Sequence, residues 1–240
     1  MRVWTASMLL VAILSVLPTS NLRAGEEEKK TIAILYFENN SIAQKEELAP
    51  LSKGLADMLI TEMSKIEALK VIERAQLQQL LDEMKLGMTG NIDEKTAQQV
   101  GKLLGAQTLL LGGFVNMFGG NLRIDARMVE VETGLTLKAE EETGKVDKLF
   151  EMVKKLTQKI AKDLEVKLTK EDKARLAVTE NENFEASLYY SKGLDLQDAG
   201  KYAEAVQMYQ KALAANPKFS QAQNRLEEIK QKLETEKPKE

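Results

Sequence analysis

The sequence predicts a mixed α/β domain followed by an all-helical C-terminal unit. Short β-rich apolar runs and amphipathic helical segments follow one another from residue 31 to residue 168. The element order β-α-β-α-α-β-β-β-α, with three strands in succession within residues 107–141, predicts one mixed sheet with helices packed on it. Beyond residue 184 the apolar residues recur with helical spacing only.

The first 24 residues have the composition of a secretory signal peptide. Arg2 supplies a positive charge, residues 8–17 are apolar, and a polar segment leads to Ala24. The apolar run is well short of the roughly 20 residues that span a bilayer, so we expect cleavage near Ala24 rather than an uncleaved anchor. No cysteine follows it to carry a lipid. Residues 25–30 are predicted to be a flexible charged leader, and the protein is expected in the periplasm.

Composition narrows the range of functions. Without the predicted signal, 216 residues remain, with 32 basic and 37 acidic side chains and therefore a net charge of −5. This acidic balance argues against a nucleic-acid partner, which needs a basic face. Cysteine and histidine are absent, which removes thiolate chemistry and the commonest general base. We therefore expect no cofactor, no metal and no enzymatic activity.

The first half of the α/β domain is predicted from hydrophobic periodicity. Residues 31–37 form a buried strand, residues 38–47 a polar loop, and residues 48–66 a helix with one apolar stripe. A second strand covers residues 69–72. Helices follow at residues 75–86 and 94–104, and Asp93 is the expected N-cap of the latter.

The second half is predicted to be a meander and a long helix. Strands cover residues 107–115, 122–132 and 135–141, with hairpin turns at 116–121 and at Thr133-Gly134. A switch of the apolar face at Val129 predicts a bulge, or burial on both faces. Leu135, Leu137 and Ala139 alternate in the last strand. A helix then covers residues 146–168, and residues 169–183 are predicted to be a linker that is in part helical.

Residues 186–219 have the spacing of one 34-residue tetratricopeptide repeat. Gly193 sits where two helices would cross, Gly200 and Tyr202 form the turn between them, and Pro217 closes the unit. Residues 220–233 resemble a capping helix, so the predicted unit spans residues 184–234 and a charged tail covers residues 235–240. The residues that carry the repeat motif are Tyr189, Gly193, Gly200, Tyr202, Ala205, Tyr209, Ala212 and Pro217.

A single repeat is too small to be stable alone, since three or more are normally needed. It must therefore pack against the α/β domain, against a second copy of the chain, or against a partner protein. Two roles stay open for it: a protein-docking module, or a stabilising appendage.

Three segments of the α/β domain carry a family resemblance: residues 70–83, with a Glu-Arg pair before a helix rich in glutamine and leucine; residues 104–114, Ala-x-x-hydrophobic-Gly; and residues 122–134, an arginine-bearing strand ending in Thr-Gly. In this order they resemble the periplasmic domain of the curli-secretion channel family, CsgG, over residues 31–168. The motif residues are Glu73, Arg74, Gly112, Thr133 and Gly134.

The departures from that family shape the functional prediction. The family inserts long membrane-crossing hairpins at positions that correspond to residues 116–121 and 142–146. Both segments are too short here, because each membrane-crossing strand needs about nine to eleven residues. The resemblance thus implies a soluble relative without a pore and without direct membrane insertion. The architecture is also shared by outer-membrane activators of peptidoglycan synthases and by the N-terminal domain of TolB.

Several charged or glycine-rich motifs have two interpretations. Gly112-Gly113 and Gly119-Gly120 could suggest a phosphate cradle, but no lysine and hydroxyl residue follow, so turn and packing roles are favoured. Glu73 and Arg74 could be an active-site pair, but a buried or half-buried ion pair at the strand-to-helix junction is the better interpretation. The acidic runs 26–28 and 140–142 are interpreted as solvated faces rather than as calcium sites.

These observations predict an exported, non-enzymatic envelope scaffold or adaptor. Its partner would be an envelope or outer-membrane protein, or a second copy of itself, and any contact with the outer membrane would run through that partner. The alternative is a regulator of a cell-wall synthase or of a secretion or curli-type assembly machinery. A third hypothesis, binding of a small ligand or nucleotide in a sheet crevice, has no phosphate-binding loop to support it.

Overall fold

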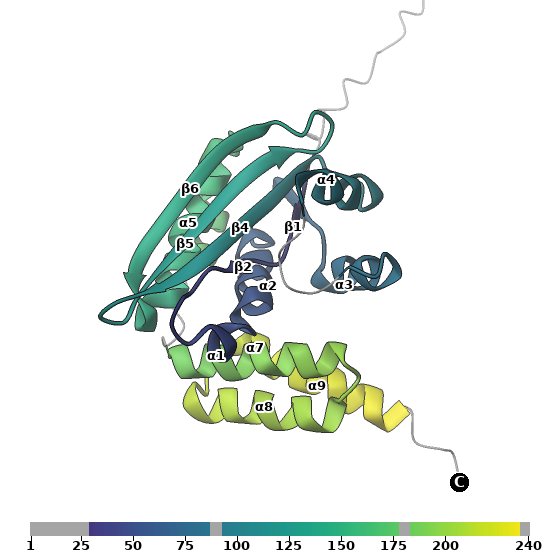
Figure 1. Ribbon diagram of the computed structural model, residues 1–240, viewed down its shortest axis with the longest axis vertical. Coiled ribbons are helices and arrows are strands. Elements are labelled where there is room, and N and C mark those ends of the chain that lie inside the picture. Colours follow the sequence, from purple (N-terminus) through teal and green to yellow (C-terminus); the bar gives the residue numbers. More distant parts are fainter. Residues whose placement is uncertain (1–28, 87–92, 178–182, 236–240) are drawn as a thin grey trace, which may run out of the picture.

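The protein has the predicted architecture of a mixed α/β fold followed by helices. The computed structural model describes residues 29–86, 93–177 and 183–235. The predicted signal peptide, most of the leader and most of the charged tail lie outside these ranges. Figure 1 shows a twisted sheet with helices on both faces, and the last three helices as a layer below it.

The sheet in the described residues has the strand order β3-β1-β4-β5-β6, and a short strand, β2, pairs with the far end of β4. β1 is parallel to β3 and to β4, whereas β4, β5 and β6 form the predicted antiparallel meander. Helical crossovers join the parallel strands and short turns join the antiparallel ones, as the two kinds of pairing require. The bounds are β1 Lys30–Ile34, β2 Glu38–Asn39, β3 Leu69–Val71, β4 Thr108–Met117, β5 Asn121–Glu130 and β6 Thr136–Lys145.

The predicted irregularity of the middle meander strand is confirmed. The register between β5 and β6 shifts at Met128 and Val129, and both of these side chains are buried. Because neighbouring residues of a strand point to opposite faces, both faces of the sheet are covered at this point. The core on one face lies under α2 and α5, and α4 packs on the other face against Leu109 and Val131.

The alternation predicted for the last strand is wrong as a guide to burial. Leu135 and Leu137 are 66% and 46% exposed, and Ala139 is exposed too. The register with β5 turns Glu140, Glu142 and Gly144 toward α5 instead. Pairing with the neighbouring strand therefore sets the orientation of β6, because a shift of one residue exchanges the two faces.

The four main helices of the α/β domain form where periodicity predicted them: α2 Leu51–Met63, α3 Arg74–Glu83, α4 Glu94–Leu103 and α5 Leu149–Asp163. The N-cap of α4 is confirmed, since the Asp93 carboxylate accepts hydrogen bonds from the backbone N–H groups of Lys95 and Thr96. The hydrogen bond from the Thr96 hydroxyl lowers the pKa of Asp93, together with those from the backbone.

Three short elements, β2, α1 and a 3₁₀ turn, go beyond the sequence prediction, and a fourth, α6, gives the predicted linker its helical part. The predicted loop at residues 38–47 contains β2 and the start of α1 Lys45–Leu48, and a 3₁₀ turn covers Val146–Lys148 before α5. The predicted linker contains α6 Lys170–Ala177. The buried carboxylate of Asp172 accepts hydrogen bonds from the backbone of Thr169 and Glu67, which ties α6 to the segment after α2.

The C-terminal unit packs directly on the α/β domain. Its helices are α7 Phe184–Asp198, α8 Tyr202–Ala215 and α9 Ser220–Thr235. α7 packs against α2, and Figure 1 shows it running across the lower end of that helix. The ring of Phe219, in the turn before α9, meets the ring of Phe150 on α5 edge to face, with 5.2 Å between the centroids. Of the three supports that the sequence left open, the structure therefore shows the α/β domain.

The contact between α2 and α7 is close enough to require a glycine. A Cβ atom added to Gly54 would lie 1.9 Å from Oγ and 2.9 Å from Cβ of Ser191. The Ser191 hydroxyl donates a hydrogen bond to the backbone carbonyl of Ser187, 2.7 Å away, so it is held in place. Gly54 therefore allows the two helices to approach.

We predict that Gly54→Ala destabilises the protein by about 1–3 kcal/mol, because the new methyl group overpacks the contact between α2 and α7. In a Ser191→Gly background the same change should stabilise it by about 0.5–1 kcal/mol, since alanine is the better helix former and the clash is gone. Urea unfolding of the four proteins of this double-mutant cycle measures both effects. Equal effects of Gly54→Ala in the two backgrounds would contradict the proposed contact.

Candidate functional site

The polar side of α2 is buried. Periodicity predicted one apolar stripe, and Leu51, Leu55 and Leu59 do face the core. The opposite side carries Lys53 and Asp57, which are also buried because α7 covers them. Two charged side chains thus lie between the α/β domain and the helical unit, where burial requires that they be paired.

Arg74 and Asp198 complete this interface from α3 and α7. The Arg74 guanidinium donates to both carboxylate oxygens of Asp198, at 3.0 and 2.8 Å, and its Nε lies 3.3 Å from Asp57. Lys53 reaches Asp198 at 2.5 Å and Asp195 at 3.2 Å. Both hydrogen bonds from Arg74 to Asp198 come from one nitrogen, Nη1, and hydrogen bonds between charged groups are stronger than those between neutral ones.

The last helix contributes to the same interface. Arg225 of α9 contacts Asp57 at 3.0 Å, and the hydroxyl of the buried Tyr190 donates a hydrogen bond to Asp57. Three acidic and three basic side chains therefore balance across the interface. Four of these side chains are almost fully buried, and Asp195 and Arg225 close the set at its partly exposed edge. We call this set the buried charge cluster; it consists of Lys53, Asp57, Arg74, Asp195, Asp198 and Arg225.

The electrostatics of the cluster keep Arg74 and Arg225 charged. Burial alone would lower the pKa of Arg74, but the combined effect of Asp198, Tyr36 and Asp57 outweighs it and the net pKa is raised. For Arg225, burial is likewise outweighed by Asp57 together with Tyr190 and Glu228, and its pKa is raised as well. Burial raises the pKa of Asp195 and, much more, that of Tyr190. The Tyr190 hydroxyl is therefore a neutral donor to Asp57, and neither it nor the arginines can act as a base at neutral pH.

The predicted ion pair between Glu73 and Arg74 is wrong. Glu73 is exposed at the N-cap of α3, and the ion pairs of Arg74 in the described residues are with Asp57 and Asp198. The spacing of Lys53 and Asp57 on the polar side of α2 was a local signal that both face one way. The partner Asp198 lies 124 residues away from Arg74, a distance at which one sequence carries no pairing information.

The residues of the repeat motif hold the helical unit together. A Cβ atom on Gly193 would lie 2.4 Å from the ring of Tyr209, which confirms that the helix crossing needs glycine there. Gly200 has a φ of 73° in the turn between α7 and α8. Ala205, Tyr209 and Ala212 are fully buried, Tyr189 and Tyr202 are half-buried, and Pro217 is exposed in the turn before α9.

The glycines of the family motif have packing and turn roles. A Cβ atom on Gly112 would lie 2.4 Å from the Asp125 carbonyl and 2.4 Å from the ring of Phe37. Gly119 and Gly120 have φ values of 75° and 69° in the hairpin turn. Gly134 has a φ of 75°, and the Thr133 hydroxyl accepts a hydrogen bond from the Leu135 N–H, so Thr133-Gly134 forms the predicted turn.

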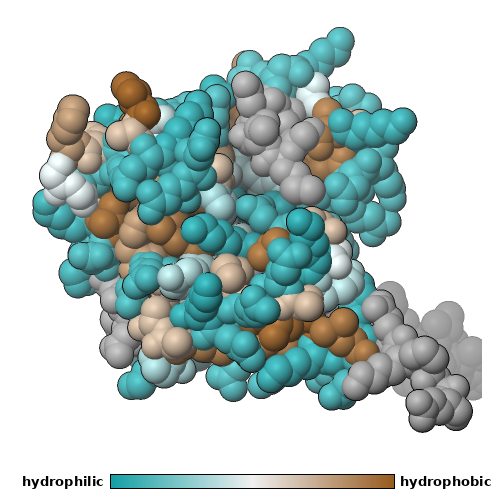
Figure 2. All heavy atoms as spheres, turned by 60° about the horizontal axis from the view of Figure 1, so that its bottom comes forward, coloured by the Kyte–Doolittle hydropathy of each residue, from teal (hydrophilic) through white to brown (hydrophobic). Residues whose placement is uncertain are grey.

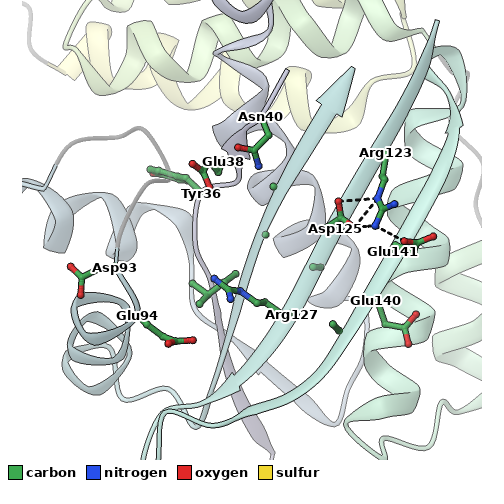
Figure 3. Close-up of a pocket in the computed structure, with 15 residues that line it drawn as sticks. Tyr36, Glu38, Asn40, Asp93, Glu94, Arg123, Asp125, Arg127, Glu140 and Glu141 are labelled. Atoms are coloured by element: carbon green, nitrogen blue, oxygen red, sulfur yellow. Dashed lines mark hydrogen bonds and ion pairs between the residues drawn. The ribbon is translucent and has the colours of Figure 1, made fainter. Parts of the chain in front are cut away.

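A polar cleft of about 560 Å³ opens on the face of the meander that α5 does not cover. In Figure 3 the Arg123 guanidinium lies between the carboxylates of Asp125 and Glu141, at 2.7 and 2.6 Å. The hydrogen bonds that Arg123 donates to Asp125 raise the pKa of Arg123. Arg127 lies over β4, and Asp93 and Glu94 approach from the start of α4. Carboxylates outnumber the two arginines in the lining, which disfavours a phosphate-bearing ligand.

The acidic run at residues 140–142 is not the solvated face that we predicted. Glu140 and Glu142 lie 3.5 and 2.9 Å from Lys159 of α5, and both are partly buried. Glu141 points to the opposite face and pairs with Arg123. The hydrogen bond that Lys159 donates to Glu142 raises the pKa of Lys159. The predicted acidic face at residues 26–28 lies outside the described residues.

Two further properties bear on the site. Within residues 29–86, 93–177 and 183–235, no group of three or more histidine, cysteine, aspartate or glutamate side chains is arranged to hold a metal ion. No helix in these ranges is long and apolar enough to cross a membrane.

Comparison with known families supports the resemblance that the sequence suggested. Residues 19–123 match the family described as curli production assembly/transport component CsgG. Residues 186–219 match the tetratricopeptide repeat. The chain thus carries a CsgG-like domain joined to a C-terminal tetratricopeptide repeat.

Solved structures resemble the fold only loosely. The C-terminal domain of LpoB from Salmonella enterica has a TM-score of 0.37 and 11% identity, and the match covers 50% of this chain and 86% of that one. The lipoprotein GNA1162 from Neisseria meningitidis has a TM-score of 0.40 and 12% identity, covering 55% and 99%. The PelC dodecamer from Paraburkholderia phytofirmans has a TM-score of 0.35 and 10% identity, covering 58% and 90%.

One relative found by sequence has the name of an enzyme rather than of an envelope protein. A protein of Rhizobium meliloti (strain 1021), whose name describes it as adenylate cyclase 3, is 30% identical over 147 residues. The match covers 61% of this chain but only 23% of that protein. This chain therefore corresponds to about a quarter of the relative.

We predict that Arg74→Met destabilises the protein by roughly 3–5 kcal/mol, because it leaves buried carboxylates without their partner. The matched control is Arg123→Met, which removes an arginine with two ion pairs from the solvent-exposed cleft and should have a much smaller effect. Urea unfolding of both variants provides the measurement. Similar losses for the two would show that the buried charge cluster does not hold the two domains together.

Proposed function

We propose that this protein is an exported, non-enzymatic envelope adaptor that binds a partner protein with its two domains acting as one rigid body. The observation that carries the proposal is the buried charge cluster, which joins the CsgG-like domain to the repeat through α2, α3, α7 and α9. Because the repeat is held against the α/β domain in this way, its helices enlarge the surface that the α/β domain offers to a partner.

The position of the repeat also limits how it binds. The side of α7 with Tyr190, Ser191 and Leu194 is buried, with Ser191 against Gly54 of α2 and Tyr190 on Asp57. A partner must therefore bind elsewhere, on the outer side of the helices or at the seam between the two domains. This favours an adaptor with a preformed surface over a repeat that acts as a free arm.

A binding role is favoured over catalysis by the state of the charged groups. Arg74 is buried and Arg225 half-buried, both of them in ion pairs, and Arg123 is held between two carboxylates. The Tyr36 hydroxyl donates a hydrogen bond to Gln78 over 2.7 Å, and burial raises its pKa. We propose that the protein forms no cyclic AMP from ATP and Mg²⁺, and measurable cyclase activity of the purified chain would contradict a non-enzymatic role.

The outer side of the helices and the seam between the two domains would also serve a regulator, either of a cell-wall synthase or of a secretion or curli-type assembly machinery. Addition of the purified protein to an isolated partner enzyme separates the two roles. An adaptor leaves the rate of that enzyme unchanged, whereas a regulator alters it.

Export is the part of the proposal that is tested first. A fusion of alkaline phosphatase to the C-terminus should be active in cells, because this enzyme needs disulfides that form outside the cytoplasm. The pair Leu10→Arg and Leu14→Arg places charges in the apolar run of the signal and should abolish that activity. The pair Gln207→Arg and Gln210→Arg, on the exposed side of α8, is the control and should leave it unchanged. An inactive parent fusion, present at a normal level, would rule out a periplasmic location.

A further inference from the structure

An apolar groove of about 960 Å³ lies at the seam between the two domains. The hairpin turn after β4 forms one wall, the segment before α1 forms another, and the start of α7 closes the third side. The floor includes Leu48, Leu122, Val146 and Leu188. Figure 2 shows apolar atoms at this left-hand end of the molecule, some of them projecting from the surface. We call this feature the seam groove.

Two large apolar side chains project into solvent from the walls of the seam groove. Ile42 is 97% exposed and Phe118 is fully exposed. Leu135, Leu103, Leu137 and Leu233 are less exposed, at 66% or below. Adjacent exposed apolar residues around a hollow mark an interaction surface, whereas single scattered ones do not.

Hydrogen bonds hold both walls in position. The Ser41 hydroxyl accepts from the Asn116 N–H at 2.9 Å, and the Asn116 side chain donates to Gln44 at 2.9 Å, which fixes the segment around Ile42 on the end of β4. Beside Phe118, the Lys145 ammonium donates to the Gly119 carbonyl at 2.6 Å. The groove is therefore preformed, and a partner need not supply the free energy to order it.

The charges on the rim indicate the chemistry of the occupant. The charged side chains in the lining are Glu47 and Glu185. Each is exposed and accepts a hydrogen bond from a neutral group, Gln44 and Tyr189 respectively, and neither takes part in an ion pair within the described residues. An occupant with lysine or arginine beside its apolar side chains would complement both carboxylates.

Resting on the adaptor role above, we propose that the seam groove binds a basic amphipathic helix of an envelope protein. A helix fits better than an added strand, because β5 pairs with β4 on one side of the groove and, on the other, the segment after β2 occupies the edge and accepts the Asn116 N–H through the Ser41 hydroxyl. A second copy of this chain would bring its own Glu47 and Glu185 against the same two residues, which like-charge repulsion disfavours. Both domains line the site, so neither would form it alone.

Binding to a defined probe tests the chemistry of the site. The probe is a labelled 18-residue peptide with leucine and phenylalanine along one helical face and lysine beside them, and its twin carries glutamate for lysine. Fluorescence anisotropy with the full chain should show at least about tenfold tighter binding of the lysine peptide. The pair Ile42→Ser and Phe118→Ser should weaken that binding by about tenfold or more, as loss of central apolar anchors does. The control Leu135→Ser, at an exposed turn outside the groove, should leave it unchanged.

Charge reversal provides the second arm of this experiment. The pair Glu47→Lys and Glu185→Lys should reduce the preference for the lysine peptide, whereas Glu204→Lys on the exposed side of α8 should not. Equal binding of the two peptides, or unchanged binding after loss of Ile42 and Phe118, would overturn the proposal.

Cross-linking in cells separates this proposal from the adaptor role itself. A photoreactive phenylalanine analogue at position 42 or 118 should capture one envelope protein, and the same analogue at position 135 should not. Capture of an envelope partner from position 135 alone would reject the seam groove and leave the adaptor role standing. Cross-links to a second copy of the chain would overturn the proposal in favour of self-association. Sedimentation with anionic lipid vesicles that is lost on Phe118→Ser would overturn it in favour of a lipid surface.

Discussion

The relative placement of the two domains depends on the pairing of Arg74 with Asp57 and Asp198. An unpaired charge inside a protein is strongly unfavourable, so each of these groups requires the others to be in place. Their balance, three acidic against three basic side chains, exists only when α7 and α9 lie on α2 and α3. A buried ion pair often adds little net stability compared with an apolar contact. Its contribution here is one defined docking geometry, which Gly54 and Ser191 reinforce through close packing.

This docking geometry explains how a single tetratricopeptide repeat can be stable in this protein. The repeat gains from α2 the packing that neighbouring repeats would otherwise provide, and Phe219 extends the contact to α5. The side of α7 that packs on α2 is therefore not available to a partner. The start of α7 is left beside the hairpin turn after β4, where Leu188 and Phe184 add to apolar residues of the α/β domain. The stabilising and docking roles that the sequence left as alternatives are therefore compatible with each other.

The sequence predicted those features whose signals are local. The helices α2 to α5 each carry an apolar stripe, α4 has its N-cap at Asp93, and the repeat has fixed spacings from Tyr189 to Pro217. The partners of Arg74 could not be predicted, because Asp57 and Asp198 come from other parts of the chain and no local rule pairs them. The orientation of β6 failed for a related reason, since the register with β5 overrides the alternation of Leu137 and Ala139. The exposure of Ile42 and Phe118 likewise depends on what packs nearby.

A groove lined by two docked domains links binding to docking. A ligand that contacts both Phe118 and Leu188 binds only while α7 lies on α2, so it must stabilise that arrangement by the free energy of its own binding. The reverse also holds. A change that weakens the buried charge cluster and lets α7 move must lower the affinity of the groove for its ligand, although no residue of the cluster lines the groove. The buried charge cluster thus holds α7 on α2. By doing so it keeps the apolar residues of the seam groove in the arrangement that a ligand can bind.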